Sequence, residues 1–349
     1  MTVFTQVFIG SLLGMASGIA LLLNLSVLFV LYRGGFLRSA QNPIFILTFL
    51  NVFGDSMQCA WILIYLTPTS ISQSFIFPYK EKGAVALLFA YLFQLQWYQC
   101  VLTQMLMSVN RLVVVVLPNF QRIFSRRNVI IITLMVFPTS AVLSVIADII
   151  LPCCTTYYYW GTFSYKFFGE GTNYKNLFMD IPLNATTSTL SLICYGTIFL
   201  FVYKSNRGVH LQSNPNIATR RKQNEIRYAL QFGLISLFFL AAWVTFRILP
   251  LLVPPTMPEW FSLTAFCVIA HCSANSFIYL TMNKEFKAQF ASMFRICSPK
   301  LAVNNLSEGR LTTVTTNVLM SSYTTNVRMG SFSMQRQPFS QNRFQRASR

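Results

Sequence analysis

Seven long apolar stretches, almost free of charged residues, constrain this chain more than any other feature of its sequence. About 20 apolar residues cross a bilayer as an α-helix, and a helix pairs its own backbone polar groups in lipid. The stretches do not alternate between apolar and polar residues, which disfavours a β-barrel. We therefore predict membrane-spanning helices over residues 7–32, 42–66, 83–117, 128–151, 181–203, 226–253 and 258–282.

The composition supports a membrane protein. Only 10% of the 349 residues are charged, whereas soluble domains contain about 25% charged residues. The expected fold class is an all-α membrane protein, a seven-transmembrane helix bundle formed by residues 1–299. A run from Asn283 to Lys287 predicts a short amphipathic surface helix after the last span. Residues 300–349 are basic and rich in Ser and Thr, so we expect a disordered tail.

The placement of basic residues predicts the orientation. Of the 27 Lys and Arg residues, 22 lie in the tail, in the loops after spans one, three and five, or at the span ends next to these loops, and 4 lie in the opposite loops. Basic residues near spans stay on the cytoplasmic side. We therefore expect a plasma-membrane protein with an extracellular N-terminus and a cytoplasmic C-terminus, surrounded by membrane lipids. The net charge of +18 is explained by this orientation, so nucleic acid is not expected as a partner.

No pattern in the chain predicts catalysis or a bound metal. The histidines, His210 and His271, are too few and too far apart in sequence for a metal site, and no paired cysteine spacing is present. We expect neither an enzyme nor a metal centre. Five cysteines inside the apolar stretches are interpreted as small core residues: Cys59, Cys100, Cys194, Cys267 and Cys272.

Five short motifs occur in order along the predicted spans. They are Asn24 in LLNLSV, Asp55 in LNVFGD, Asn110-Arg111-Leu112 followed by Pro118, Asn275-Ser276-Phe277-Ile278-Tyr279, and Asn283-Lys284-Glu285-Phe286-Lys287. Each resembles a motif of rhodopsin-like G-protein-coupled receptors on the corresponding span and side. The chain departs from the usual pattern at Asn110, Leu112 and Ser276. Ala86 stands where the usual span-three cysteine would be, so the common loop disulfide is not expected.

Three longer segments narrow the resemblance. They are WILIYLTPTSI in span two, MSVNRLVVVVLPNFQRIFS at the end of span three, and CCTTYYYW after span four. Over residues 7–297 the chain resembles the nematode chemosensory serpentine receptors of class x. This resemblance implies a receptor that binds a small extracellular cue and activates a heterotrimeric G protein. A peptide-binding receptor of the same fold and a seven-span ligand-gated channel, which needs the opposite orientation, are the alternatives.

The resemblance also implies roles for residues near the cytoplasmic side. Asn110, Arg111, Asn275 and Tyr279 correspond to the switch that couples such receptors to a G protein. A basic anchor that fixes the orientation is the alternative for Arg111. Cys297, just past the surface helix, is a lipidation candidate.

An intramembrane polar network is expected around Asp55. Asp55 lies in the middle of span two, where a carboxyl group is costly and therefore a functional candidate. We expect it to hydrogen-bond Asn24 and Asn275, and the resemblance implies a possible sodium ion beside it. The alternative is a neutral, hydrogen-bonded core aspartate.

A ligand pocket is expected near the extracellular side. Its candidate residues are Arg247, Asp148, Trp243 and Gln104. Arg247 either binds an anionic group in a cavity, pairs with Asp148, or snorkels to the interface. The aromatic loop from Cys154 to Asp180 forms either a lid or an interfacial belt. Whether Cys153 or Cys154 forms a disulfide is left open by the sequence.

Overall fold

The structure, a computed structural model, describes residues 2–38, 43–77, 83–169, 171–207, 215–254 and 256–295. Within these residues, seven helices are long and apolar enough to cross a membrane. The predicted number and order of spans are therefore confirmed. The predicted tail and Cys297 lie outside the described residues.

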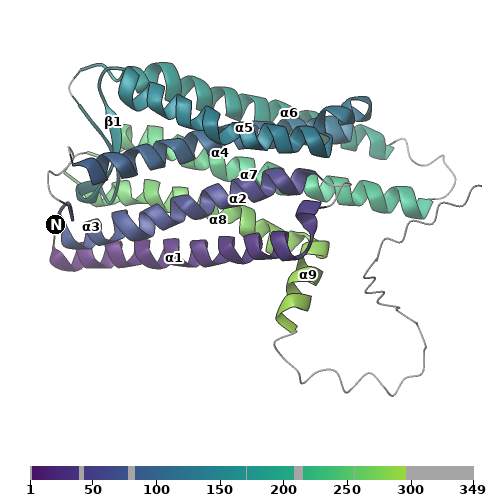
Figure 1. The fold of residues 1–349 in the computed structure, drawn as a ribbon, viewed down its shortest axis with the longest axis horizontal. Helices are drawn as coiled ribbons and strands as arrows, with labels where there is room; N and C mark the ends of the chain where they lie inside the picture. The colour runs from purple at the N-terminus through teal and green to yellow at the C-terminus, as the bar shows by residue number, and fades with distance from the viewer. Residues whose placement is uncertain are drawn as a thin grey trace, which may run out of the picture. The chain divides into compact units, whose positions relative to one another are not determined.

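The spans pack side by side in one bundle (Figure 1). Their helices are α1 (Val3–Arg33), α2 (Ile44–Trp61) continued by α3 (Thr67–Ser72), α4 (Ala84–Val116), α5 (Arg126–Val145), α6 (Ile181–Arg207), α7 (Pro215–Leu252) and α8 (Ser262–Met282). The antiparallel strands β1 (Thr155–Tyr159) and β2 (Ser164–Phe168) form a hairpin between α5 and α6, with Tyr158 opposite Tyr165. Figure 1 places this hairpin and the N-terminus at one end of the bundle, here named the hairpin end.

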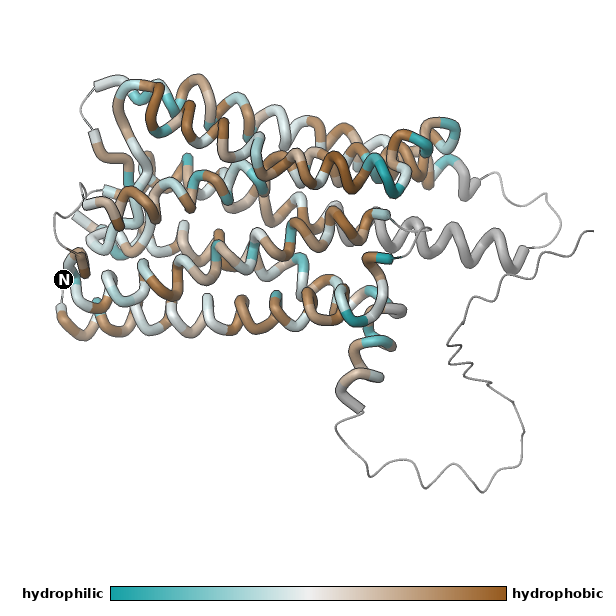
Figure 2. The backbone as a smooth tube through the Cα atoms, viewed as in Figure 1, coloured by the Kyte–Doolittle hydropathy of each residue, from teal (hydrophilic) through white to brown (hydrophobic). Residues whose placement is uncertain are grey.

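The opposite end carries α9 (Lys284–Arg295), so we name it the α9 end. Asn283 begins this helix, because its side-chain oxygen accepts a hydrogen bond from the Phe286 backbone N–H at 3.0 Å. The Phe286 side chain is fully buried against Phe36 and Tyr279. The predicted helix after the last span is present as α9. It turns away from the spans, along which hydrophobic residues recur (Figure 2).

The second span is longer than the sequence predicts. It continues past Leu66 to Ser72 although Pro68 lies within it. A π-helical turn, Ile62–Leu66, precedes the proline. Such a turn shifts the backbone hydrogen-bond pattern, which lets the helix accommodate a residue that has no N–H donor.

The helices α2, α4 and α8 form the centre of the bundle. Larger shares of their spans are buried inside the bundle than of the spans formed by α1, α5, α6 and α7. Buried polar side chains concentrate on the central helices, including Asp55, Gln99 and Asn275. Side chains facing lipid gain nothing from polarity, so polar groups gather where other helices can pair them.

Gly54 on α2 makes room for two glutamine side chains of α4. A Cβ atom at Gly54 would overlap the amide groups of Gln96 and Gln99, which hydrogen-bond each other against the α2 backbone. We expect Gly54→Ala to destabilise the bundle by about 1–3 kcal/mol, because the two buried amides must move away from the added methyl group and lose hydrogen bonds. SDS-induced unfolding in mixed micelles measures this loss.

Gly18 on α1 provides the matched control, since nothing lies within 4 Å of a Cβ atom built there. Gly18→Ala is expected to stabilise the helix by about 0.4–1 kcal/mol. Equal effects of the two substitutions would contradict the close approach at Gly54.

Candidate functional site

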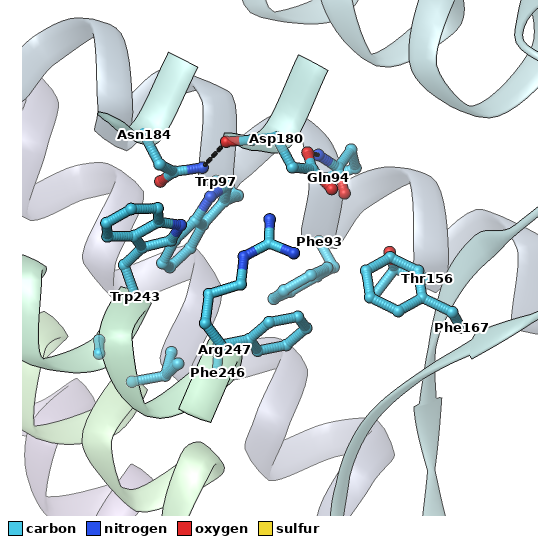
Figure 3. A pocket seen from close by; sticks show the side chains of 12 residues that line it. Phe93, Gln94, Trp97, Thr156, Phe167, Asp180, Asn184, Trp243, Phe246 and Arg247 are labelled. Atoms are coloured by element: carbon cyan, nitrogen blue, oxygen red, sulfur yellow. Dashed lines mark hydrogen bonds between the residues drawn. The ribbon is translucent and has the colours of Figure 1, made fainter. Parts of the chain in front are cut away.

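A narrow cavity of about 30 Å³ lies at the hairpin end, bounded by α4, α6, α7, α8 and the hairpin. Its walls are mostly aromatic, with Phe93 and Trp97 from α4, Phe167 from β2, and Phe246 from α7 (Figure 3). Small-molecule sites have mostly apolar walls that carry a few polar groups. The walls of this cavity have that character, while the space that they enclose is smaller than a small organic molecule.

Arg247 brings a positive charge to this cavity. Figure 3 shows its guanidinium group directed into the space between the aromatic rings. Among the described residues, its Nε atom has no hydrogen-bond partner, and no carboxylate lies within ion-pair distance. Two other lining groups, Trp243 Nε1 and Asn184 Oδ1, also lack partners in this part of the chain. These polar atoms are available to a ligand.

Asp180 lies on the same cavity wall but is already engaged. It ends the π-helical turn Asn176–Asp180 before α6, and its carboxylate accepts hydrogen bonds from Tyr98 at 2.9 Å and Gln94 at 3.2 Å. The sequence did not reveal this acid, because the predicted span began one residue later. Starting the span at Asn176 would have placed Asp180 inside it.

Asp148 is part of a separate ion pair. Its carboxylate lies 2.5 Å from the ammonium group of Lys175, and both side chains are almost completely buried. Pairing of Asp148 with Arg247, one of the predicted alternatives, is wrong, because Lys175 takes that place. Asp148 is also absent from the residues that line the cavity. Lys175 was expected in a loop, where nothing in the sequence distinguished it from an exposed lysine.

The hairpin forms part of the cavity wall. Thr156 and Phe167 line the cavity from the two strands, so the loop contacts the site as a lid would. Gln58 on α2 donates hydrogen bonds to the Tyr158 and Tyr165 hydroxyl groups at 3.2 and 3.4 Å. Burial raises the pKa of both phenols well above the ordinary value, so both stay neutral.

The cysteines before the hairpin bond to each other. Cys153 and Cys154 form a disulfide, and both have positive φ angles. The question that the sequence left open is thus answered in the structure. Gly169 packs tightly against this pair, since a Cβ atom there would lie 2.7 Å from Cys153 Sγ. Ala86, which stands where related receptors usually have a cysteine, is buried on α4. The hairpin packs against α4.

The polar network around Asp55 lies deeper in the bundle. The Asp55 carboxylate accepts hydrogen bonds from Asn275 at 2.7 Å and from Asn51 at 3.1 Å. Asn24 instead donates to the Cys272 carbonyl at 3.1 Å and accepts from Ser276 at 2.6 Å. The expected contact of Asp55 with Asn275 is present, whereas Asn24 connects to α8 beside it.

Asp55 also has two neighbours that the sequence did not suggest. Ligand atoms of Asp55, Cys100 and His271 all lie within 4.8 Å of one another, and all three residues are buried. They come from α2, α4 and α8, so no spacing along the chain brings them together. Only the packing of the central helices reveals this group.

The proposed switch residues lie toward the α9 end. Arg111 is buried near the end of α4, and the preceding Asn110 has an Oδ1 atom without a partner among the described residues. Tyr279 on α8 hydrogen-bonds Thr48 on α2 at 2.8 Å. The arrangement ties α8 to α2 through neutral groups.

Gln104 lies outside the cavity at the hairpin end. It donates a hydrogen bond to Ser236 on α7, near a second hollow between α6 and α7. Leu192, Phe199 and Leu237 on the rim of that hollow are largely exposed. In a bilayer these side chains would face acyl chains.

Comparison with known proteins establishes the family. Residues 15–283 match the model of the serpentine-type seven-transmembrane G-protein-coupled chemoreceptors, Srx. The chain belongs to this family. The predicted resemblance to the class-x receptors is therefore confirmed. This Srx receptor is a multi-pass membrane protein. No curated protein matches it.

A solved structure supports the fold of this Srx receptor independently. The crystal structure of squid rhodopsin aligns with a TM-score of 0.71 over 85% of this chain and 87% of that chain. The sequence identity is 16%, so the likeness concerns the fold alone. The predicted seven-helix receptor bundle is confirmed.

Proposed function

We propose that this receptor binds a small molecule with an anionic head group in the cavity beneath the hairpin. The observation that carries the proposal is the Arg247 guanidinium, which reaches an aromatic cavity with its Nε atom unpaired. A carboxylate matches a guanidinium in charge and planar geometry. The surrounding rings favour an apolar body attached to that head group.

The hairpin supports a small cue rather than a peptide. The cavity encloses about 30 Å³, so a ligand would have to displace side chains that line it, and a smaller molecule would displace fewer of them. A peptide would also need the hairpin to move, since Thr156 and Phe167 line the cavity. Small carboxylates therefore require the least rearrangement.

The α9 end is the proposed site of G-protein coupling. The charge bias of the loops supports a plasma-membrane orientation with the hairpin outside and α9 in the cytoplasm. Ligand binding would favour a packing of the spans that exposes Arg111 to the G protein. The residue before Arg111 is the neutral Asn110, at the position where an acidic residue is usual.

Reporter cells that display the receptor on their surface test this function. We expect a response to some members of a panel of small aliphatic and aromatic carboxylates, and none to the matching primary amides. Arg111→Ala should remove the response, and Arg111→Lys should restore part of it, because the charge is retained. Confirmed surface display with no response to the panel would contradict the proposed cue. An unchanged response of Arg111→Ala would contradict the coupling role.

A further inference from the structure

The sodium ion implied beside Asp55 does not fit the groups that surround this carboxylate. Hard cations prefer oxygen ligands, whereas thiolates and imidazoles select zinc and related metals. The Cys100 thiol and the His271 imidazole each place a potential metal-ligand atom within 4.8 Å of the Asp55 carboxylate. A small cavity reaches all three groups. The donor set therefore favours a different ion.

The geometry points to a zinc site formed by Asp55, Cys100 and His271, and we propose that the receptor binds one Zn²⁺ there. Zinc takes carboxylate oxygen, thiolate sulfur and imidazole nitrogen at about 2.0–2.3 Å, so tetrahedral ligand atoms lie roughly 3.3–3.8 Å apart. The Cys100 Sγ and His271 Nε2 atoms are already 3.2 Å apart, and the widest separation in the group is within 4.8 Å. Shifts of about 1 Å complete the coordination sphere.

The unsatisfied state of His271 is the second observation. Its ring is almost completely buried, Nε2 contacts only the Cys100 thiol, and Nδ1 has no hydrogen-bond partner among the described residues. A thiol is a weak hydrogen-bonding group. Buried polar atoms are normally paired, so an imidazole in this state indicates a missing ligand. A metal bound at Nε2 supplies the strong interaction that the protein does not.

Charge balance favours the same ion. Within the described residues, no lysine or arginine forms an ion pair with Asp55, although a carboxylate in the centre of a membrane protein is costly. Zn²⁺ binding forms bonds to oxygen, nitrogen and sulfur, and the Cys100 thiol gives its proton to solvent water. One carboxylate and one thiolate then neutralise the dication, while His271 stays neutral.

A fourth ligand is available without a change of fold. The Cys272 thiol lies beside both Asp55 and Cys59, and it precedes the network residue Asn275 by less than one helical turn. Either this sulfur or a water in the small cavity completes a tetrahedron. Asn275 and Asn51 hold the Asp55 carboxylate in place, as second-shell partners do in zinc sites. The metal thereby joins α2, α4 and α8.

Metal titration of the purified full-length receptor tests the site, and it requires neither the ligand nor a G protein. After treatment with a chelator, we expect one equivalent of Zn²⁺ to bind and to raise the melting temperature. Co²⁺ in its place should show a thiolate-to-metal charge-transfer band. Cys100→Ser and His271→Asn should each weaken Zn²⁺ binding by about 100-fold or more. Cys267→Ser, which removes a free cysteine elsewhere on α8, should leave binding unchanged.

Sodium titration separates the two ions. The double variant Cys100→Ser with His271→Asn replaces the thiol and the imidazole by oxygen-bearing groups, so it should lose Zn²⁺ binding while keeping any stabilisation by Na⁺. A wild-type protein that is stabilised by Na⁺ but takes up no Zn²⁺ would overturn the zinc proposal. Wild-type protein that binds Co²⁺ without the charge-transfer band would overturn it as well, and this readout does not depend on the folding of a variant.

Discussion

Replacing Lys175 by methionine is expected to destabilise the folded bundle by about 3–5 kcal/mol, because removing one partner leaves the other charge buried and unpaired. The Lys175 ammonium group lies 2.5 Å from Asp148, and their side chains are 0% and 6% exposed. SDS-induced unfolding in mixed micelles measures the change. The loss exceeds what an exposed pair would give, which is about 1 kcal/mol or less.

The double replacement provides the control. Lys175→Met combined with Asp148→Leu removes both charges and fills the space with apolar side chains, so stability should return to near the wild-type value or rise above it. Lys166→Met removes an exposed lysine from the hairpin and should have little effect. A double variant as unstable as Lys175→Met alone would show that the ion pair is not the source of the loss.

Replacing Arg247 by glutamine is expected to lower the potency of active carboxylates by about 30-fold or more. Loss of a desolvated, charge-assisted contact costs about 2 kcal/mol or more, and Arg247 is the cation directed into the cavity. Dose–response curves in the reporter cells measure this shift. Arg247→Lys keeps the charge but loses the planar two-point contact, so the potency of carboxylates on it should fall between those on the wild-type receptor and on Arg247→Gln.

Lys166→Gln is the matched control for charge at this end of the bundle, since Lys166 lies over the rings of Tyr159 and Phe168 outside the cavity. Its carboxylate potency should stay close to that of the wild-type receptor. Equal shifts for Arg247→Gln and Lys166→Gln would indicate long-range attraction of anions instead of direct binding.

The spans were predictable because each is a local property of the chain. A window of apolar residues marks a helix in lipid, and this signal placed all seven spans within the described residues. The extension of the second span to Ser72 was missed, because Pro68 reads as a helix end in sequence. The π-helical turn that accommodates it carries no sequence mark of its own.

The site was predictable only in part. Arg247 and Trp243 were named from their place in the sixth span, and both line the cavity. Asp180 and Lys175 were missed because their roles depend on contacts with α4 and with the π-helical turn that follows α5. The grouping of Cys100 and His271 with Asp55 was missed for the same reason, since three helices must pack before it exists.

The buried hairpin also affects how fast a bound cue could be released. Phe163 at its turn is fully buried, Tyr158 and Tyr165 are buried as well, and Gln58 holds both hydroxyl groups. A cue bound as proposed would lie against this hairpin, and the need to break these contacts would slow its release. The receptor would then average a fluctuating cue concentration over the opening time of the hairpin.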